Sequence, residues 1–470
     1  MSSRNFCGVI GESSVSELSE MISKLNFNNL YKHQVQDFEE GVFVGMNGIA
    51  TDENTENKIG SLSEKFKVIC FAVFANKLEL ISKLRCSPLI SNDELIIKAY
   101  DKWGKECVKY LQGSWAFVLW DVNKKEAVLA RNPTSDGTLF YYHKEDKLYF
   151  SSLVTSLLGV KGFDAKINKL KFFSECMKFS GIDNHTLYQN IFALPPAHVM
   201  VFKQNKLYIE QYWDLGNIKP IRFKNEKDYA DGLYSLYHQI IAETFTANSN
   251  YAGTLSAGYD SMITTLLASN FMEKQNKKFS VVTFHANEIE DRGKIKANSE
   301  LEAVSNFVNQ HQNLDWHLTK DSYSLFDFLD SYTNHFGMPP FTANLWYIDS
   351  VAEGVRSLGY KEAIIAQGGN DALSYEGVLP SSNLQQLMSD IKTGYNLSPT
   401  KFPKQVIEAS LKSISKERYK LLPKLRKERI KNTITNNTIL HADFLHEIDA
   451  VNYMDYFINT QNEKCSIHKK

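Results

Sequence analysis

One stretch constrains this chain more than any other, the 255–261 loop, which has the sequence Leu-Ser-Ala-Gly-Tyr-Asp-Ser. The partly apolar run 251–255 predicts a buried strand, and apolar residues at near-helical spacing over 262–271 predict a helix. A turn from a strand into a helix binds anions, because free backbone N–H groups and the helix dipole point into it. We therefore interpret the loop as a phosphate-binding site.

The side chains of the loop favour a pyrophosphate with a bound cation. Gly258 permits close backbone approach, and Ser256 and Ser261 supply hydroxyl donors. Asp260 would repel a phosphate unless a cation such as Mg²⁺ lies between them. The loop lacks the Gly-Lys-Ser/Thr ending of a Walker site. The alternative is an ordinary strand-to-helix turn in which Asp260 and Ser261 serve as helix caps.

Composition narrows the function classes. A chain of 470 residues holds two or three domains. Its formal net charge is −1 and 43% of its residues are hydrophobic, so it is typical of a soluble globular protein and gives no electrostatic case for nucleic acid. No apolar run reaches the length of a membrane span, and no signal-peptide core follows the N-terminus. The six scattered cysteines form no Cys-x-x-Cys pair, which favours reduced thiols in a cytoplasm and argues against zinc.

The first 215 residues alternate between strand and helix patterns. The strands are predicted at 7–10, 68–74, 114–121, 126–131, 139–142, 147–151, 191–194, 198–202 and 207–212, and the helices at 92–103, capped by Asn92 or Asp93, and 170–179. A polar turn at 123–125 joins two of these strands as a hairpin.

The order of these pieces resembles the glutaminase domain of the asparagine synthetase family. The segments that carry the resemblance are 113–121, 129–131, 140–142, 150–152, 194–198 and 212–215. The 255–261 loop then resembles the family's Ser-Gly-Gly-x-Asp-Ser pyrophosphate loop, and the resemblance spans about residues 5–380. It implies an α+β Ntn-hydrolase-like sandwich over 1–215, a polar linker over 216–228, and an α/β doubly wound parallel-sheet ATP-pyrophosphatase-like domain over 229–470 with a helical C-terminal part.

In that family an N-terminal cysteine attacks the amide of glutamine, with its own α-amine as the base. Cys7 resembles this nucleophile, but its amine is free only if residues 1–6 are removed. The Asn-Gly-Glu segment of the family's glutamine pocket falls at 71–73, which is Phe-Ala-Val, and the acidic residue for the substrate amine falls near Asn92, beside Asp93. No arginine stands between residues 4 and 85 to hold the substrate carboxylate. We expect an inactive scaffold in which Cys7 is a vestigial nucleophile and a small core residue.

The second half predicts a doubly wound sheet. Its predicted strands are 251–255, 279–284 and 363–366, and its predicted helices are 229–246, 262–271, 299–310 with Asn298 or Ser299 as cap, 323–336 and 345–358. Strands that alternate with helices form a parallel sheet whose ligand loops follow the carboxyl ends of the strands.

A second signature follows the last of these strands. Residues 367–371, Gln-Gly-Gly-Asn-Asp, resemble the family's Gly-rich turn before Asp-Glu-Leu, and the resemblance implies that Asp371 shares Mg²⁺-pyrophosphate with Asp260. Gln367 is the candidate for the amine step, because the family's polar residue falls at Gly368. The alternative for Asp371 is a turn residue. The nucleotide contacts so implied are Leu255, Ser256, Ala257, Gly258, Asp260, Ser261, Val282, Ala366 and Gln367.

This half also departs from the family. Ala257 replaces a glycine and is expected to narrow the approach to the backbone. Ala372 replaces the glutamate of the second signature, and the chain is shorter than usual after it. The Lys/Arg-rich segment 401–431 is interpreted as a solvated helix face, with a docking surface or active-site lysines as alternatives. A last helix is expected over 443–456.

Three functions remain open. The first is an ATP-dependent amide ligase that adenylates a carboxylate without using glutamine, nearest in type to lasso peptide cyclases and β-lactam synthetases. It implies ATP and Mg²⁺, a peptide or small-molecule substrate, and a precursor peptide with a partner peptidase. The second is a glutamine-dependent asparagine synthetase. The third is a catalytically inactive nucleotide-binding scaffold.

Overall fold

The structure is a computed structural model. It describes residues 5–11, 15–25, 31–39, 41–49, 63–134, 138–176, 184–219, 221–245, 250–285, 291–320, 325–340, 346–360, 362–366 and a few positions between 444 and 454. The chain divides into two compact units, residues 1–168 with 181–365, and residues 169–180 with 366–470. Helix α5 (Lys169–Cys176) belongs to the second unit.

The first unit opens with two antiparallel sheets. One has the order β2-β3-β1-β8-β7-β9 and the other β11-β10-β6-β5-β4. Their strands are β1 (Phe6–Ile10), β2 (Tyr31–Glu39), β3 (Val42–Ile49), β4 (Phe66–Phe74), β5 (Gly113–Asp121), β6 (Glu126–Arg131), β7 (Phe140–Lys144), β8 (Lys147–Ser151), β9 (Ile191–Ala193), β10 (His198–Lys203) and β11 (Lys206–Gln211).

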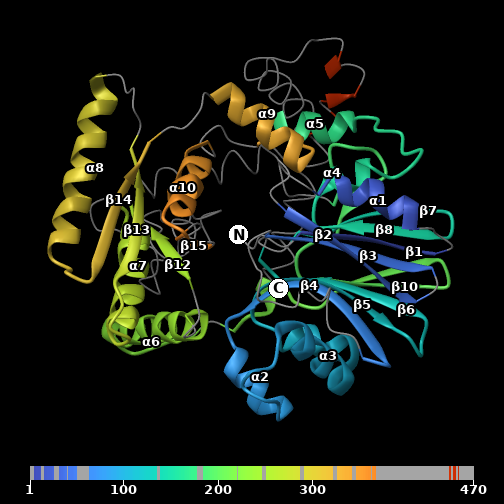
Figure 1. The fold of residues 1–470 in the computed structure, drawn as a ribbon, viewed down its shortest axis with the longest axis horizontal. Coiled ribbons are helices and arrows are strands. Elements are labelled where there is room, and N and C mark those ends of the chain that lie inside the picture. The colour runs from blue at the N-terminus through green and yellow to red at the C-terminus, as the bar shows by residue number, and fades with distance from the viewer. Residues whose placement is uncertain are drawn as a thin grey trace, which may run out of the picture. The chain divides into compact units, whose positions relative to one another are not determined.

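Helices cover both outer faces of this sandwich. Helices α1 (Val15–Ser23) and α4 (Val154–Leu158) pack on the six-stranded sheet, and α2 (Lys77–Leu84) and α3 (Asn92–Trp103) lie on the five-stranded sheet, followed by the short helix η1 (Gly104–Lys109). Figure 1 shows the four layers, with α1 above the strands and α3 below. Because both faces of each sheet are covered, β5 is almost continuously apolar, although antiparallel strands usually alternate.

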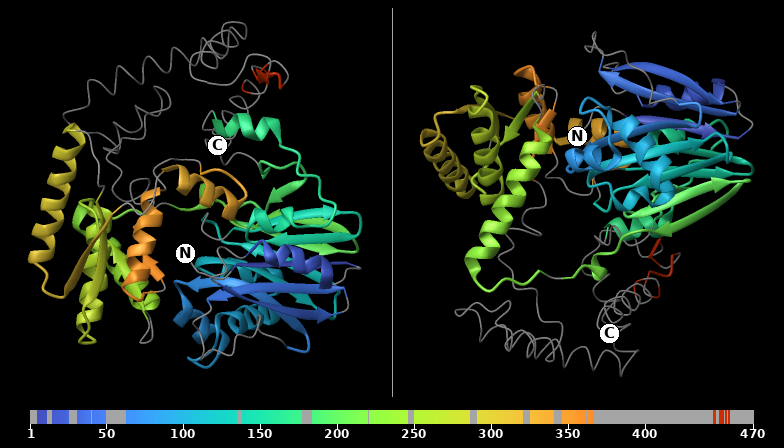
Figure 2. Two further views of the ribbon diagram at one scale, coloured as in Figure 1. Left: turned by 45° about the horizontal axis from the view of Figure 1, so that its top comes forward. Right: turned by 90° about the horizontal axis from the view of Figure 1, so that it is seen from below.

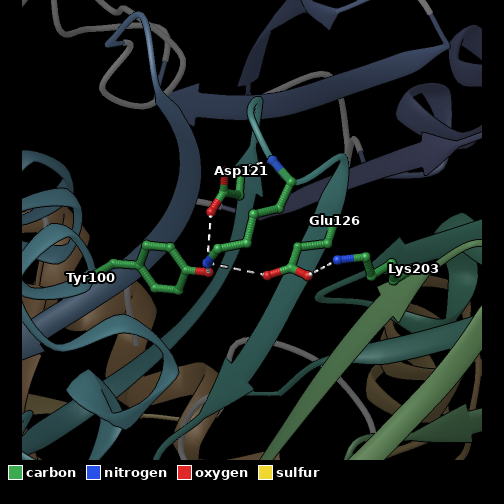
Figure 3. Close-up of polar contacts among 5 residues, drawn as sticks. Tyr100, Asp121, Glu126 and Lys203 are labelled. Atoms are coloured by element: carbon green, nitrogen blue, oxygen red, sulfur yellow. Dashed lines mark hydrogen bonds and ion pairs between the residues drawn. The ribbon is translucent and has the colours of Figure 1, made fainter.

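A network of ion pairs holds the β5–β6 turn against α3. Lys124 Nζ lies 3.0 Å from Asp121 Oδ2 and 3.5 Å from Glu126 Oε1, and it donates to the hydroxyl of Tyr100 at 3.3 Å. Lys203 on β10 pairs with the other oxygen of Glu126 at 3.1 Å (Figure 3). Burial raises the pKa of Tyr100 to about 12, so its phenol stays neutral as an acceptor. The turn predicted at 123–125 is thus fixed to the helix layer.

The same unit continues into a four-stranded parallel sheet of order β14-β13-β12-β15. Its strands are β12 (Tyr251–Thr254), β13 (Phe279–Phe284), β14 (Leu314–Thr319) and β15 (Glu362–Ile364). The accompanying helices are η2 (Leu215–Asn217), α6 (Glu226–Thr244), α7 (Tyr259–Glu273), α8 (Asp291–Asn309), α9 (Leu325–Phe336) and α10 (Trp346–Ser357).

Neighbouring residues of β13 face opposite helix layers. Val281 packs with residues of α6, α7 and α8, whereas Val282 packs with Val351 and Val355 of α10. Helices α8 and α10 accordingly lie on opposite sides of the strands (Figure 1, Figure 2). This alternation along one strand explains its apolar sequence and confirms the doubly wound arrangement of the parallel sheet.

Two predicted helix starts were wrong. Helix α3 is capped by Ser91, not by Asn92 or Asp93, because Ser91 and Glu94 form a reciprocal capping box. Helix α8 begins at Asp291, so Asn298 and Ser299 lie inside it. The domain boundaries at 1–215, 216–228 and 229–470 stay predictions. The segments 367–443 and 455–470, with the basic run 401–431, lie outside the described residues, as do half of the positions of the predicted helix 443–456.

Gly8 on β1 provides a test of the sandwich core. A Cβ atom at this position would lie 2.2 Å from Cζ of Phe150 and 2.8 Å from the carbonyl oxygen of Phe43. We expect Gly8→Ala to lower the free energy of unfolding by about 1–3 kcal/mol, because Phe150 is fully buried and has no room to move. Urea unfolding measures the change.

The matched control is Gly232→Ala on α6. A Cβ atom there meets only Phe223, at 3.6 Å, so this variant should gain about 0.5–1 kcal/mol from helix propensity. Equal stability of Gly8→Ala and the wild type would contradict the packing between the two sheets.

Candidate functional site

The 255–261 loop lies at the point where the order of the parallel strands reverses. From β12 the chain runs to β13 on one side, while β15 pairs with β12 on the other side. The loop leaves the carboxyl end of β12 and leads into α7. In doubly wound sheets, ligands bind in the crevice outside the carboxyl ends of the strands at such a switch point.

Helix α7 begins without a side-chain cap. Gly258 is the N-cap residue, and it has no side chain with which to bond the N–H groups of the first turn. The hydroxyl of Ser261 accepts from the N–H of Ser256 at 3.1 Å and lies 2.9 Å from the hydroxyl of Ser256. Asp260 and Ser261 therefore do not occupy the N-cap position, and the ordinary strand-to-helix turn stays an alternative to the phosphate-binding interpretation.

Ala257 does not narrow the loop as the sequence suggested. Its methyl group packs against the apolar cluster that contains Ile241, Leu255 and Leu267, so the side chain points into the core. Gly258 has open space where a side chain would stand, because its nearest neighbour would be the hydroxyl of Ser256 at 3.4 Å. Position 258 is thus free of neighbouring carbon atoms beyond its chain neighbours.

Asp260 lies half-buried in the first turn of α7. Burial first, and then the negative charge of Asp260, raise the pKa of Tyr237 on α6. A carboxylate at this place supplies the oxygen ligand that Mg²⁺ prefers. Among the residues that the structure describes, no group of three His, Cys, Asp or Glu side chains is placed to hold a metal ion. Asp371, Gln367 and Gly368 lie outside the described residues, so the Asp260–Asp371 metal site stays a prediction.

The backbone bonds of Leu255 fix the start of the loop. Its N–H donates to the carbonyl of Val282 at 3.0 Å, and its carbonyl accepts from the hydroxyl of Thr283 at 2.8 Å. The side chain of Val282 is buried against α10, and Ala366 is half-buried two residues after β15. The nucleotide contacts predicted for Val282 and Ala366 stay predictions. The sequence analysis missed Thr283. The feature that could have revealed it is a hydroxyl near the carboxyl end of a mostly apolar strand.

Cys7 is enclosed by the helix layer of the sandwich. Its side chain is 0% exposed and packs with apolar residues of α1 and α4. Burial raises the pKa of the Cys7 thiol from 9.0 to about 12, against a smaller opposing effect of Ser156. The thiolate, which is the nucleophilic form, is therefore suppressed.

The residues before Cys7 are built into the sheet. Phe6 is fully buried, its N–H donates to Ser152 Oγ at 3.0 Å, and its carbonyl accepts from the N–H of Ser152 at 2.9 Å. Asn5 and Asn47 exchange two further bonds, from the N–H of Asn5 to Asn47 Oδ1 at 2.7 Å and from the N–H of Asn47 to the carbonyl of Asn5 at 3.0 Å. The Phe6–Cys7 peptide bond therefore joins the first two residues of β1, a central strand of its sheet.

The residues at the positions that resemble the glutamine pocket make hydrogen bonds and packing contacts within the protein. Asn92 Nδ2 donates to the carbonyl of Ala72 at 2.7 Å, and Asp93 accepts from the thiol of Cys70 at 3.1 Å. Phe71 and Ala72 on β4 pack against the apolar clusters on the two sides of the sheet. At these described positions the amide nitrogen of Asn92 and the carboxylate of Asp93 thus bond within the protein, and the absence of glutaminase activity stays a prediction.

Thiol labelling tests the enclosure of Cys7. We expect iodoacetamide at pH 8 to modify the exposed Cys176 in the native protein and to leave Cys7 unmodified, with peptide mass spectrometry as the measurement. Both should react in urea. Because the unfolded thiol ionises first, Cys7 should also make the fold lose stability as the pH rises above about 9. Fast native labelling of Cys7 would show that β1 opens readily.

The chain is similar to known proteins over part of its length. Residues 77–213 match the pattern of a glutamine amidotransferase domain. A putative glutamine-hydrolysing asparagine synthetase 2 of Methanocaldococcus jannaschii is 31% identical over 170 residues, which are 35% of this chain and 33% of that protein. Asparagine synthetase 3 of Bacillus subtilis is 24% identical over 189 residues, 40% of this chain and 30% of that protein.

Longer but weaker matches exist. The amidase chry2 of Gibberella zeae is 22% identical over 293 residues, 60% of this chain and 42% of that protein. The matched part thus spans less than half the length of each of these relatives. The solved glutamine phosphoribosylpyrophosphate amidotransferase of B. subtilis, complexed with ADP and GMP, aligns with 77% of this chain and 90% of that chain at 12% identity, with a TM-score of 0.33, which is too low to support an argument. No helix in the described part of the chain has the length and apolar character to cross a membrane. Over residues 77–213 the chain thus carries a glutamine amidotransferase-like domain, and over part of its length it is similar to glutamine-hydrolysing asparagine synthetases.

Proposed function

We propose that this protein is an ATP-dependent amide-bond-forming ligase that does not use glutamine. A substrate carboxylate attacks the α-phosphorus of ATP, an acyl-adenylate forms and pyrophosphate leaves. An amine then attacks the acyl carbon, the amide bond forms, and AMP departs. The electrophile is a carboxylate of a peptide or a small natural-product precursor.

The chemistry requires a site that stabilises negative charge on the leaving pyrophosphate. The helix dipole and the N–H groups at the start of α7, whose N-cap Gly258 has no side chain, point into the 255–261 loop. Ser256 and Ser261 bond to each other and to the loop backbone, which fixes the conformation of the loop. Asp260, with Asp371 as the predicted partner, would hold Mg²⁺, which when bound neutralises charge on the phosphate oxygens. The observation that carries the proposal is this loop, with open space at Gly258, at the switch point of the parallel sheet.

The closed sandwich argues for an amine that does not come from glutamine. The buried Cys7 and the apolar 71–73 segment give no means of releasing ammonia. An amine already present in the same substrate needs no ammonia channel, and its high effective concentration favours ring closure. We therefore propose macrolactam formation of the lasso cyclase type, with a precursor peptide and a partner peptidase, in the cytoplasm.

Asp260 provides the direct test of the ATP site. We expect Asp260→Ala to abolish turnover and Asp260→Asn to weaken Mg²⁺-dependent ATP binding at least tenfold, or by about 1.4 kcal/mol, because the metal loses a charged ligand. Isothermal titration calorimetry with ATP, in Mg²⁺ and again in EDTA, measures the affinity.

The control for this test is Asp231→Asn, an exposed aspartate on α6 whose loss should leave the affinity unchanged. Equal affinity of Asp260→Asn and the wild type would remove Asp260 from the site. A folded wild type that binds no ATP in Mg²⁺ would instead favour the inactive scaffold.

The names of the relatives favour a second candidate, a glutamine-dependent asparagine synthetase. It requires Cys7 at the mature N-terminus. We expect N-terminal sequencing of the purified protein to find residues before Cys7, and glutamate release from glutamine to be no faster than in a Cys7→Ala variant. Sequencing that begins at Cys7, together with glutamine hydrolysis above that control, would establish the second candidate in place of the first.

A further inference from the structure

We infer that Thr283 and Trp316 are positioning residues for the phosphate loop, and that they set the direction of the peptide unit between Leu255 and Ser256. The inference rests on the proposed ATP site and adds to it two residues outside the loop. Thr283 lies on β13 and Trp316 on β14, and neither belongs to the sequence signature of the loop.

The two side chains form a directed relay. Trp316 Nε1 donates to Thr283 Oγ1 at 2.8 Å, and Thr283 Oγ1 donates to the carbonyl oxygen of Leu255 at 2.8 Å. An indole N–H only donates, so the threonine hydroxyl accepts from it and has its own proton left for Leu255. Thr283 is only 6% exposed. Loss of either hydrogen bond is therefore costly, because water has little access to replace it.

The relay acts on the loop through peptide geometry. The carbonyl of Leu255 and the N–H of Ser256 belong to one planar unit and point in opposite directions. When Thr283 holds the carbonyl toward β13, the N–H of Ser256 faces the turn, where it donates to Ser261 Oγ at 3.1 Å. The relay thus orients the first N–H group of the loop and, through it, the hydroxyl of Ser261.

Thr283 also explains an irregularity of its strand. The other positions on the same face of β13 are Phe279 and Val281, which fill the core. A threonine in this setting would leave a buried hydroxyl unpaired unless a partner stood nearby. Here the hydroxyl has one donor and one acceptor, and the acceptor is the residue where the loop begins.

Substitution of Thr283 tests the relay. Thr283→Val keeps the shape of the side chain and removes both bonds, so we expect ATP and free pyrophosphate, each with Mg²⁺, to bind about tenfold more weakly, while adenosine affinity is unchanged. Thr283→Ser retains the hydroxyl and should restore affinity to within about twofold of the wild type. Trp316→Phe removes only the donor to Thr283 and should weaken ATP binding about two- to threefold.

The matched control lies on the same strand. Ser280→Ala removes a hydroxyl that bonds to Tyr360 and Asp315, three residues before Thr283, and should lower the melting temperature without changing ATP affinity. Thermal melts confirm that each variant folds. A folded Thr283→Val that binds ATP as the wild type does would overturn the relay and leave the proposed function standing. A wild type that fails to bind ATP would overturn both.

Discussion

The N-terminus of helix α7 is the physical constraint on which the functional account depends. The first four N–H groups of any helix lack partners within the helix, and they must bond to a cap, to water or to a ligand. In α7 the N-cap residue is Gly258, which has no side chain to take them, and the loop serines bond to each other and to the loop backbone. We propose that the phosphates of a bound nucleotide take these N–H groups.

In the sandwich, by contrast, the potentially reactive thiol of Cys7 is buried. A nucleophilic cysteine needs access, an ionised thiol and a nearby base. Cys7 has none of these, since it is fully buried, its pKa is raised to about 12, and Asn5 and Phe6 hold its backbone amide inside the sheet. The sandwich thus uses the side chain of Cys7 for packing.

Local signals predicted much of this fold. The apolar run of β13 and the strand, turn and helix around the 255–261 loop were evident because each depends on residues adjacent in sequence. Strand β14 was missed, since it lies at the edge of its sheet and is half exposed, which weakens its pattern. The direction of Ala257 depends on how the loop packs against α6 and α7. The relay through Thr283 and Trp316 joins residues 28 and 33 positions apart, which no local pattern encodes.

The central claim is that the 255–261 loop holds the phosphates of ATP in a protein whose Cys7 stays enclosed. The most direct test is a crystal structure with a non-hydrolysable ATP analogue and Mg²⁺. Our account predicts the phosphate chain in this loop against the first turn of α7, a metal ion at Asp260, and residues before Cys7 still in place on β1. A nucleotide bound elsewhere, or a loop left empty at saturating analogue, would contradict it.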